Sequence, residues 1–100
     1  MGYKVVITSR ANGDLRQVVE FLAAKNPSAA ERLGFRLLDM AQSLADMPHR
    51  GIRVRNRESV RRVPCGKWHA IYYRVFAELC VIEITRFWDG RRNPADLDLP

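Results

Sequence analysis

The sequence predicts an α+β domain with the element order β-α-α-β-β-β, in which a helical hairpin covers one face of a mostly antiparallel sheet. Three observations lead to this fold. The chain opens with a short β-branched run and continues with two amphipathic helical segments that are almost directly joined. The last third of the chain has the pattern of consecutive strands. We interpret residues 1–100 as a single domain in which residues 94–100 form a loosely held tail.

The first strand and the first helix occupy the N-terminal quarter. Tyr3–Ile7 is β-branched, and we expect it to join the sheet after the helices, beside the last strand. Thr8 and Ser9 are candidate helix N-caps. Apolar residues at helical spacing follow, namely Leu15, Val18, Val19 and Leu22. This helix should end near Lys25.

A second helix should begin at Asn26-Pro27. Asn is a favoured N-cap, and Pro suits the first helical position because its missing N–H would be unpaired there anyway. The apolar stripe of this helix consists of Ala30, Leu33, Leu37, Ala41 and Leu44. Met47-Pro48 should stop it near Asp46. Both helical stripes are interpreted as core.

The remaining chain predicts a basic loop over His49–Ser59, a short strand over Val60–Val63 and a turn over residues 64–67. Longer strands are expected over Trp68–Phe76 and Leu79–Phe87, followed by a turn at Asp89-Gly90. In the first of these strands, one face is expected to contain Ile71, Tyr73 and Val75. In the second, one face is expected to contain Cys80, Ile82 and Ile84. The sheet face opposite the helices should be open and rich in Arg and Trp, which makes it a candidate binding face.

The net charge of +6 is concentrated in the second half of the chain. Between His49 and Phe76 there are eight basic residues and a single acidic one, Glu58. Such a patch attracts nucleic acid or an acidic protein segment, whereas the alternative is a solvated face that aids solubility. The candidate partner-binding residues are Arg61, Arg62, Arg74, Arg86, Trp88, Arg91 and Arg92.

The sequence contains no nucleophile elbow, no phosphate-cradling glycine loop and no metal-ligand spacing of His and Cys, so neither a metal nor a cofactor is expected. Cys65 and Cys80 are interpreted as small buried or half-buried residues without a disulfide. No apolar run reaches the ~18 residues of a membrane span, and the N-terminus lacks the features of a signal peptide. We therefore expect a cytosolic protein.

One enzymatic hypothesis survives, the metal-independent cleavage of RNA. The 2′-hydroxyl of RNA is the nucleophile in that reaction, so the protein need supply only a base, an acid and cations. The arginines qualify as cations, and His49 and His69 are the candidate proton-transfer groups. After Trp88, however, the chain contains neither Tyr nor His, which disfavours an enzyme.

Four segments together resemble the RelE/ParE superfamily of bacterial type II toxin–antitoxin toxins, and within it the ParE branch. They are DLRQVVEFLAAKNPSAAERL, ADMPHRGIRVR, VRRVPCGKWHAIYYRV and VIEITRFWDGRRNP, and the resemblance spans Tyr3 to Asn93. It implies a helical hairpin on a curved antiparallel sheet and a cognate antitoxin that wraps the toxin. The antitoxin-binding residues implied on the hairpin and sheet are Leu15, Val19, Leu22, Leu33, Arg36, Leu37 and Tyr73.

The resemblance implies growth arrest either by poisoning of DNA gyrase, as in the ParE branch, or by ribosome-dependent mRNA cleavage, as in the RelE branch. The RelE branch uses basic residues on the sheet and an aromatic residue or His near the C-terminus. Here the tail offers Arg91 and Arg92 without a Tyr, and the strand position of a catalytic Arg falls near His69 or Ala70, so gyrase is favoured. The turn after the last strand is Asp89-Gly90 where the family often has His-Gly. A third hypothesis is a small basic nucleic-acid-binding module without toxicity.

Overall fold

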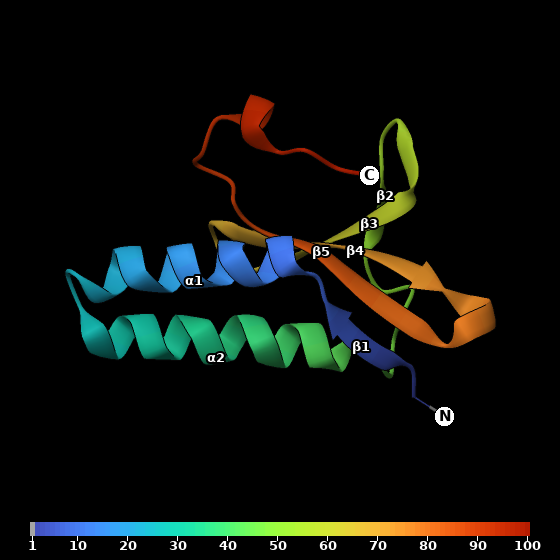
Figure 1. Cartoon of the computed structure of the whole chain (residues 1–100), viewed down its shortest axis with the longest axis horizontal. Coiled ribbons are helices and arrows are strands. Elements are labelled where there is room, and N and C mark those ends of the chain that lie inside the picture. Colours follow the sequence, from blue (N-terminus) through green and yellow to red (C-terminus); the bar gives the residue numbers. More distant parts are fainter. Residues whose placement is uncertain (1) are drawn as a thin grey trace.

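The computed structural model describes residues 2–100, which form one five-stranded sheet with two helices on one face (Figure 1). The elements in chain order are β1 (Lys4–Ile7), α1 (Ser9–Ala23), α2 (Pro27–Ser43), β2 (Ile52–Val54), β3 (Arg57–Cys65), β4 (His69–Phe76), β5 (Val81–Asp89) and two 3₁₀ turns, η1 (Ala77–Leu79) and η2 (Pro94–Asp96). The strand order is β1-β5-β4-β3-β2, with β1 parallel to β5 and the other pairs antiparallel. The α+β class and the place of the first strand beside the last are confirmed.

Both helices begin at the expected caps. The side chain of Thr8 accepts a hydrogen bond from the Ala11 N–H at 3.1 Å, and that of Asn26 accepts one from the Ala29 N–H at 3.1 Å. The helices end at Ala23 and Ser43, a little earlier than expected, because the following residues form hydrogen-bonded turns. Among residues 2–100, no helix is long and apolar enough to cross a membrane.

The main core lies between the helical hairpin and the sheet. Its buried apolar members include Leu37, Leu44, Ile71, Tyr73, Ile82, Ile84 and Phe87. Tyr73 also fixes the chain that follows α2, because its hydroxyl donates to the Pro48 carbonyl at 2.9 Å and accepts from the Gly51 N–H at 2.8 Å. A Cβ on Gly51 would lie 2.7 Å from that hydroxyl oxygen, so this position has room only for Gly.

A second, smaller cluster covers the sheet face that we expected to be open. It consists of Val60, Ala70, Tyr72 and Trp88, against which Leu97 and Leu99 of the C-terminal tail pack. Figure 1 shows the tail returning over the sheet towards β2. The prediction of an open face is therefore wrong, because Leu97 and Leu99 of the tail pack against it.

The expected basic loop over residues 49–59 instead contains β2 and the start of β3. Asn56 takes the left-handed conformation, with φ of 64°, at the turn between these strands. Their exposed arginines hide the apolar alternation that usually marks a strand. Strand β3 also continues through Pro64 to Cys65, because the pairing of β2 ends at Arg62 and a missing N–H is tolerated where a strand has no neighbour on that side.

Strand β5 is shifted towards the C-terminus relative to the expected Leu79–Phe87. Cys80 lies before the strand with φ of 53° and is exposed, so it does not share a face with Ile82. The ladder with β4 has a bulge, because Tyr72 pairs with Arg86 whereas Tyr73 pairs with Ile84. This extra residue reverses the alternation, so that Phe87 enters the main core while Arg86 pairs on the face of Tyr72.

Candidate functional site

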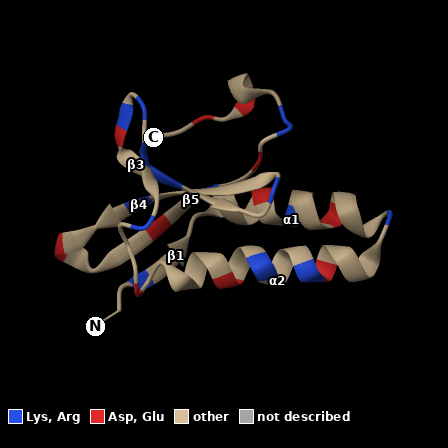
Figure 2. Cartoon of the chain, turned by 180° about the vertical axis from the view of Figure 1, so that it is seen from behind, with Lys and Arg blue, Asp and Glu red and all other residues tan. Residues whose placement is uncertain are grey.

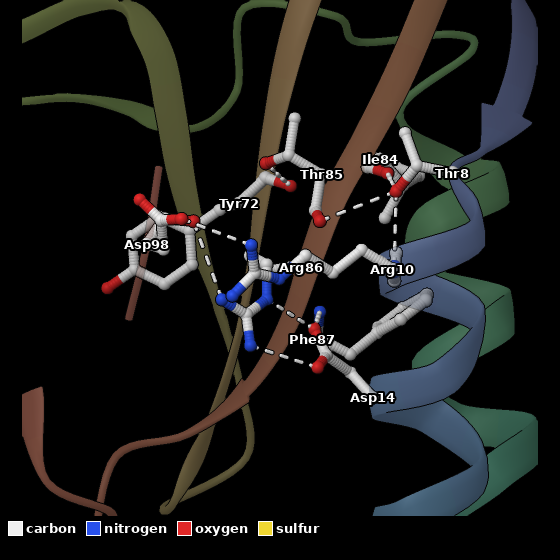
Figure 3. Close-up of polar contacts among 10 residues, drawn as sticks. Thr8, Arg10, Asp14, Tyr72, Ile84, Thr85, Arg86, Phe87 and Asp98 are labelled. Atoms are coloured by element: carbon white, nitrogen blue, oxygen red, sulfur yellow. Dashed lines mark hydrogen bonds and ion pairs between the residues drawn. The ribbon is translucent and has the colours of Figure 1, made fainter. Parts of the chain in front are cut away.

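Arg86 is the most deeply buried of the candidate binding residues that carry a charge. It is 4% exposed, and its Nε and Nη2 donate to the two carboxylate oxygens of Asp14 at 2.6 and 3.0 Å (Figure 3). The same carboxylate accepts the backbone N–H of Phe87 at 3.2 Å. The pairing of β1 with β5 ends at Ile84, so β1 offers no acceptor to the Phe87 N–H. Asp14 of α1 supplies that acceptor instead. Arg86 therefore ties α1 to the sheet and exposes little surface of its own.

Trp88 is also internal, with 4% of its surface exposed. The guanidinium groups of Arg86 and Arg92 both lie over its ring, with Cζ atoms 5.1 and 4.8 Å from the ring centroid. The tail covers it further, since Leu97 packs on the same cluster. A partner could reach this ring only after displacing the tail.

The candidate residues on β3 and β4 lie in or beside a basic groove. The groove is lined by His49, Arg53, Glu58, Ser59, Arg61, Arg74, Val75 and Phe76. Arg61 donates to the Gly51 carbonyl at 2.8 Å, and Arg74 pairs with Glu83 at 2.7 Å. Arg62 is exposed on the other face of β3, opposite Tyr72. In Figure 2, Lys and Arg also mark α2 and the turn after β5, so the positive charge is not confined to one strand.

The most organised exposed cluster lies where the β3–β4 turn meets the end of β5. Arg91 donates through Nε and Nη2 to the two carboxylate oxygens of Asp89, at 2.9 and 2.7 Å. Its Cζ lies 5.0 Å from the ring centroid of Trp68, and Lys67 Nζ lies 5.0 Å from the same centroid. Sequence reasoning missed Trp68 as a candidate because it assigned the residue to a strand, whereas it lies in the turn before β4. The signal that could have found it is the neighbouring Gly66-Lys67 turn.

The ionisation of this cluster follows from its contacts. Hydrogen bonds from Arg91 hold the pKa of the Asp89 carboxyl below its ordinary value. Burial lowers the pKa of His69, although the Asp89 carboxylate, 3.9 Å from its Nε2, opposes that shift. Near neutral pH the cluster therefore presents a neutral imidazole beside an ion pair. Cys65, behind it, has a pKa raised by burial.

Two grooves flank this cluster. One lies along α1 and is lined by Gln17, Val18, Phe21, Lys25, Asp89, Arg91 and Arg92. The other lies between the hairpin and the β3–β4 turn, and its lining includes Leu22, Leu33, Arg36, Lys67, Trp68 and His69. A third groove follows the outer face of α2, where Phe35 and Met40 lie among Arg32, Arg36, Asp39 and Arg50.

The candidates for antitoxin binding divide between core and surface. Leu37 and Tyr73 have no exposed surface, so they support the fold rather than contact a partner. Leu15, Val19, Leu22 and Leu33 are half-buried, and Arg36 is exposed. Leu22, Leu33 and Arg36 border the groove between the hairpin and the β3–β4 turn, so these three remain available to a partner.

Comparisons with known proteins agree with this fold. Residues 5–94 match the family described as ParE toxin of the type II toxin–antitoxin system, parDE. Toxin RelE1 of Caulobacter vibrioides is 31% identical over 91 residues, which cover 90% of this chain and 96% of that protein.

Two solved structures have the same fold. The toxin–antitoxin complex RelBE2 from Mycobacterium tuberculosis contains a chain with a TM-score of 0.70 and 21% identity, covering 89% of this chain and 99% of that chain. The chromosomal ParDE toxin–antitoxin system from P. aeruginosa contains one with a TM-score of 0.74 and 18% identity, covering 87% of this chain and 95% of that chain.

Proposed function

Because the chain belongs to the ParE toxin family of type II toxin–antitoxin systems, we propose that it arrests bacterial growth by inhibiting DNA gyrase through protein–protein contact. A cognate antitoxin neutralises it. The choice of gyrase over mRNA as the target rests on the closed sheet face opposite the helices. On that face, Trp88 is buried beneath the C-terminal tail.

A nuclease working on that face would need free cations and a proton-transfer pair at an accessible surface. Arg86, which pairs on that face, is neutralised by Asp14. The segment that covers the face contains neither Tyr nor His. This combination supports action by contact, because Arg86 is already paired, the exposed Arg62 of the same face lies opposite the buried Tyr72, and the cover brings no proton-transfer group.

The outer groove of α2 supports the antitoxin as partner. Phe35 is 59% exposed there, and three arginines surround it, which suits the apolar and acidic residues of an amphipathic segment. Both solved relatives are toxin–antitoxin assemblies, which supports the same kind of partner for this chain.

The two targets are separated by two assays on one protein preparation. Purified toxin should block supercoiling by gyrase and leave translation of a reporter mRNA intact. Adding the protein encoded by the neighbouring gene should restore supercoiling, and toxin purified as that complex is the matched control. Cleavage of the mRNA on ribosomes, with supercoiling unaffected, would refute the gyrase proposal.

The mRNA interferase remains the second candidate, and one observation favours it. His69 lies beside Asp89 in a groove that also contains Arg36, so an imidazole and cations come together there. If His69 transfers a proton, His69→Ala should lower activity by about 100-fold or more. We expect instead that toxicity stays nearly intact, as it should in the matched variant His49→Ala.

A further inference from the structure

Two exposed aromatic side chains flank Arg91 at the end of the sheet. Phe21 of α1 is 67% exposed and lines the same groove as Arg91. Trp68, from the β3–β4 turn, is 46% exposed, and its ring centroid lies 5.0 Å from Arg91 Cζ. Three segments far apart in the sequence thus build one surface, and we name Phe21, Trp68 and Arg91 the aromatic ridge.

The side chains of the aromatic ridge are held in place before any partner arrives. The Asp89 carboxylate fixes the guanidinium of Arg91 through two hydrogen bonds of 2.9 and 2.7 Å. Lys25 Nζ lies 4.7 Å from the ring centroid of Phe21, and Lys67 Nζ lies 5.0 Å from that of Trp68. A pre-oriented side chain loses less rotational freedom on binding, and Trp and Arg are the residue types that most often dominate interface energies.

The charge of the aromatic ridge selects an acidic partner. Lys25, Lys67 and Arg92 surround it, in addition to Arg91. Among the described residues that line the α1 groove, Asp89 is the one carboxylate, and it is already paired with Arg91. An acidic protein surface would complement this arrangement.

The ridge also differs from the other candidate surfaces. The α2 groove sets Asp39 beside its exposed phenylalanine, and the groove by β3 contains Glu58. A nucleic acid fits the ridge less well than a protein does, because cations already lie over the ring of Trp68 where a base would stack.

We propose that the aromatic ridge is the surface through which this toxin grips an acidic face of its protein target. The inference rests on the proposed function, because it assumes action by contact. It replaces the sequence-based candidates Arg86 and Trp88, which are internal, with Phe21 and Trp68 beside Arg91. The target then contacts α1 and the β3–β4 turn, whereas the antitoxin groove around Phe35 lies on the outer face of α2.

The test compares Phe21→Ala, Trp68→Ala and Arg91→Glu with the matched control Leu79→Ala, which removes an apolar side chain that is 71% exposed on η1. Each variant is measured for thermal stability, for inhibition of purified gyrase and for binding to the antitoxin. We expect each ridge variant to need at least about 10-fold more toxin for half-inhibition, as hot-spot side chains do. Leu79→Ala should inhibit gyrase like the wild type. Phe21→Ala and Arg91→Glu, which lie outside the groove bordered by Leu22, Leu33 and Arg36, should keep their affinity for the antitoxin.

The outcomes separate the two proposals. If the wild type inhibits gyrase and the ridge variants do so equally well, the inference fails and the proposed function stands. If the wild type arrests growth without inhibiting gyrase, the proposed function fails, and the ridge is judged by whether its variants still arrest growth. A wild-type chain that does neither overturns both.

Two further controls protect the interpretation. If Trp68→Ala melts at a far lower temperature than the wild type, the proposal is judged on Phe21→Ala and Arg91→Glu alone. Both of these side chains are exposed, so their substitution should not destabilise the fold. A single-stranded RNA oligonucleotide serves as the competing probe. Tight binding of this RNA that is lost in Trp68→Ala would make the ridge a nucleic-acid site and overturn the inference.

Discussion

Removing the carboxylate of Asp14 should damage the fold far more than removing an exposed carboxylate. The Asp14 side chain is 8% exposed and that of Arg86 is 5% exposed, so their ion pair is shielded from water. Asp14→Ala would leave a buried guanidinium without its counter-charge and the Phe87 N–H without its acceptor. Breaking a buried pair in this way costs about 3–5 kcal/mol, mostly because the remaining charge cannot be solvated.

Comparing two substitutions separates the loss of unfolding free energy into the contribution of the charge and that of the hydrogen bond to Phe87. Asp14→Asn keeps one oxygen that can accept from the Phe87 N–H but also leaves the guanidinium without its counter-charge, so its loss should be smaller than that of Asp14→Ala by only about 1 kcal/mol, the value of one hydrogen bond. Asp14→Ala removes both functions. For a chain of this length, ~1 kcal/mol lowers the melting temperature by about 4–8 °C, so Asp14→Ala should lower it by more than about 10 °C.

The assay is urea unfolding followed by circular dichroism. Asp39→Ala is the matched control, because Asp39 is an exposed carboxylate on α2, and it should change stability by less than about 0.5 kcal/mol. If Asp14→Ala proved as stable as Asp39→Ala, Arg86 would be able to reach water. The structural role assigned to Arg86 would then be wrong.

Three further expectations follow from the same contacts. Truncation before Leu97 should uncover the ring of Trp88, shift its fluorescence to longer wavelength and weaken the fold without unfolding it. Gly51→Ala should lower the melting temperature clearly, because its Cβ would lie 2.7 Å from the Tyr73 hydroxyl oxygen. Burial lowers the pKa of His69 below the ordinary 6.5, so the unfolded chain binds more protons near that pH. Stability should therefore fall on acidification through pH ~6.5, and His69→Gln should reduce that slope in urea titrations at several pH values.

The sequence predicted the elements whose determinants are local. The caps at Thr8 and Asn26, the two helical stripes and the strands either side of η1 follow from residue type and spacing. The β2–β3 hairpin was missed because arginines occupy its exposed positions and hide the alternation. The bulge that separates Tyr72 from Tyr73 was missed because a register is set by pairing between strands.

The candidate site was predicted in composition but not in position. Arg91 and Arg92 lie in the turn after β5, as expected from the Asp89-Gly90 signal. Arg86 and Trp88, which precede that turn on β5, are internal. Their burial depends on a carboxylate 72 positions away from Arg86 and on a tail that the sequence predicts to be loosely held. Neither contact has a local signature.

Two aspartates explain how one basic, aromatic strand end can serve both folding and binding. Asp14 and Asp89 each hold an arginine through two hydrogen bonds, but Asp14 is buried and comes from α1, whereas Asp89 shares its arginine with a half-exposed Trp68. The first pair stabilises the sheet, and the second holds a guanidinium at the exposed surface. Deleting residues 87–100 would take Phe87 out of the main core, so such a truncation tests folding. Substitutions at Trp68 and Arg91 leave that core intact, and they are therefore the changes that can distinguish target binding from stability.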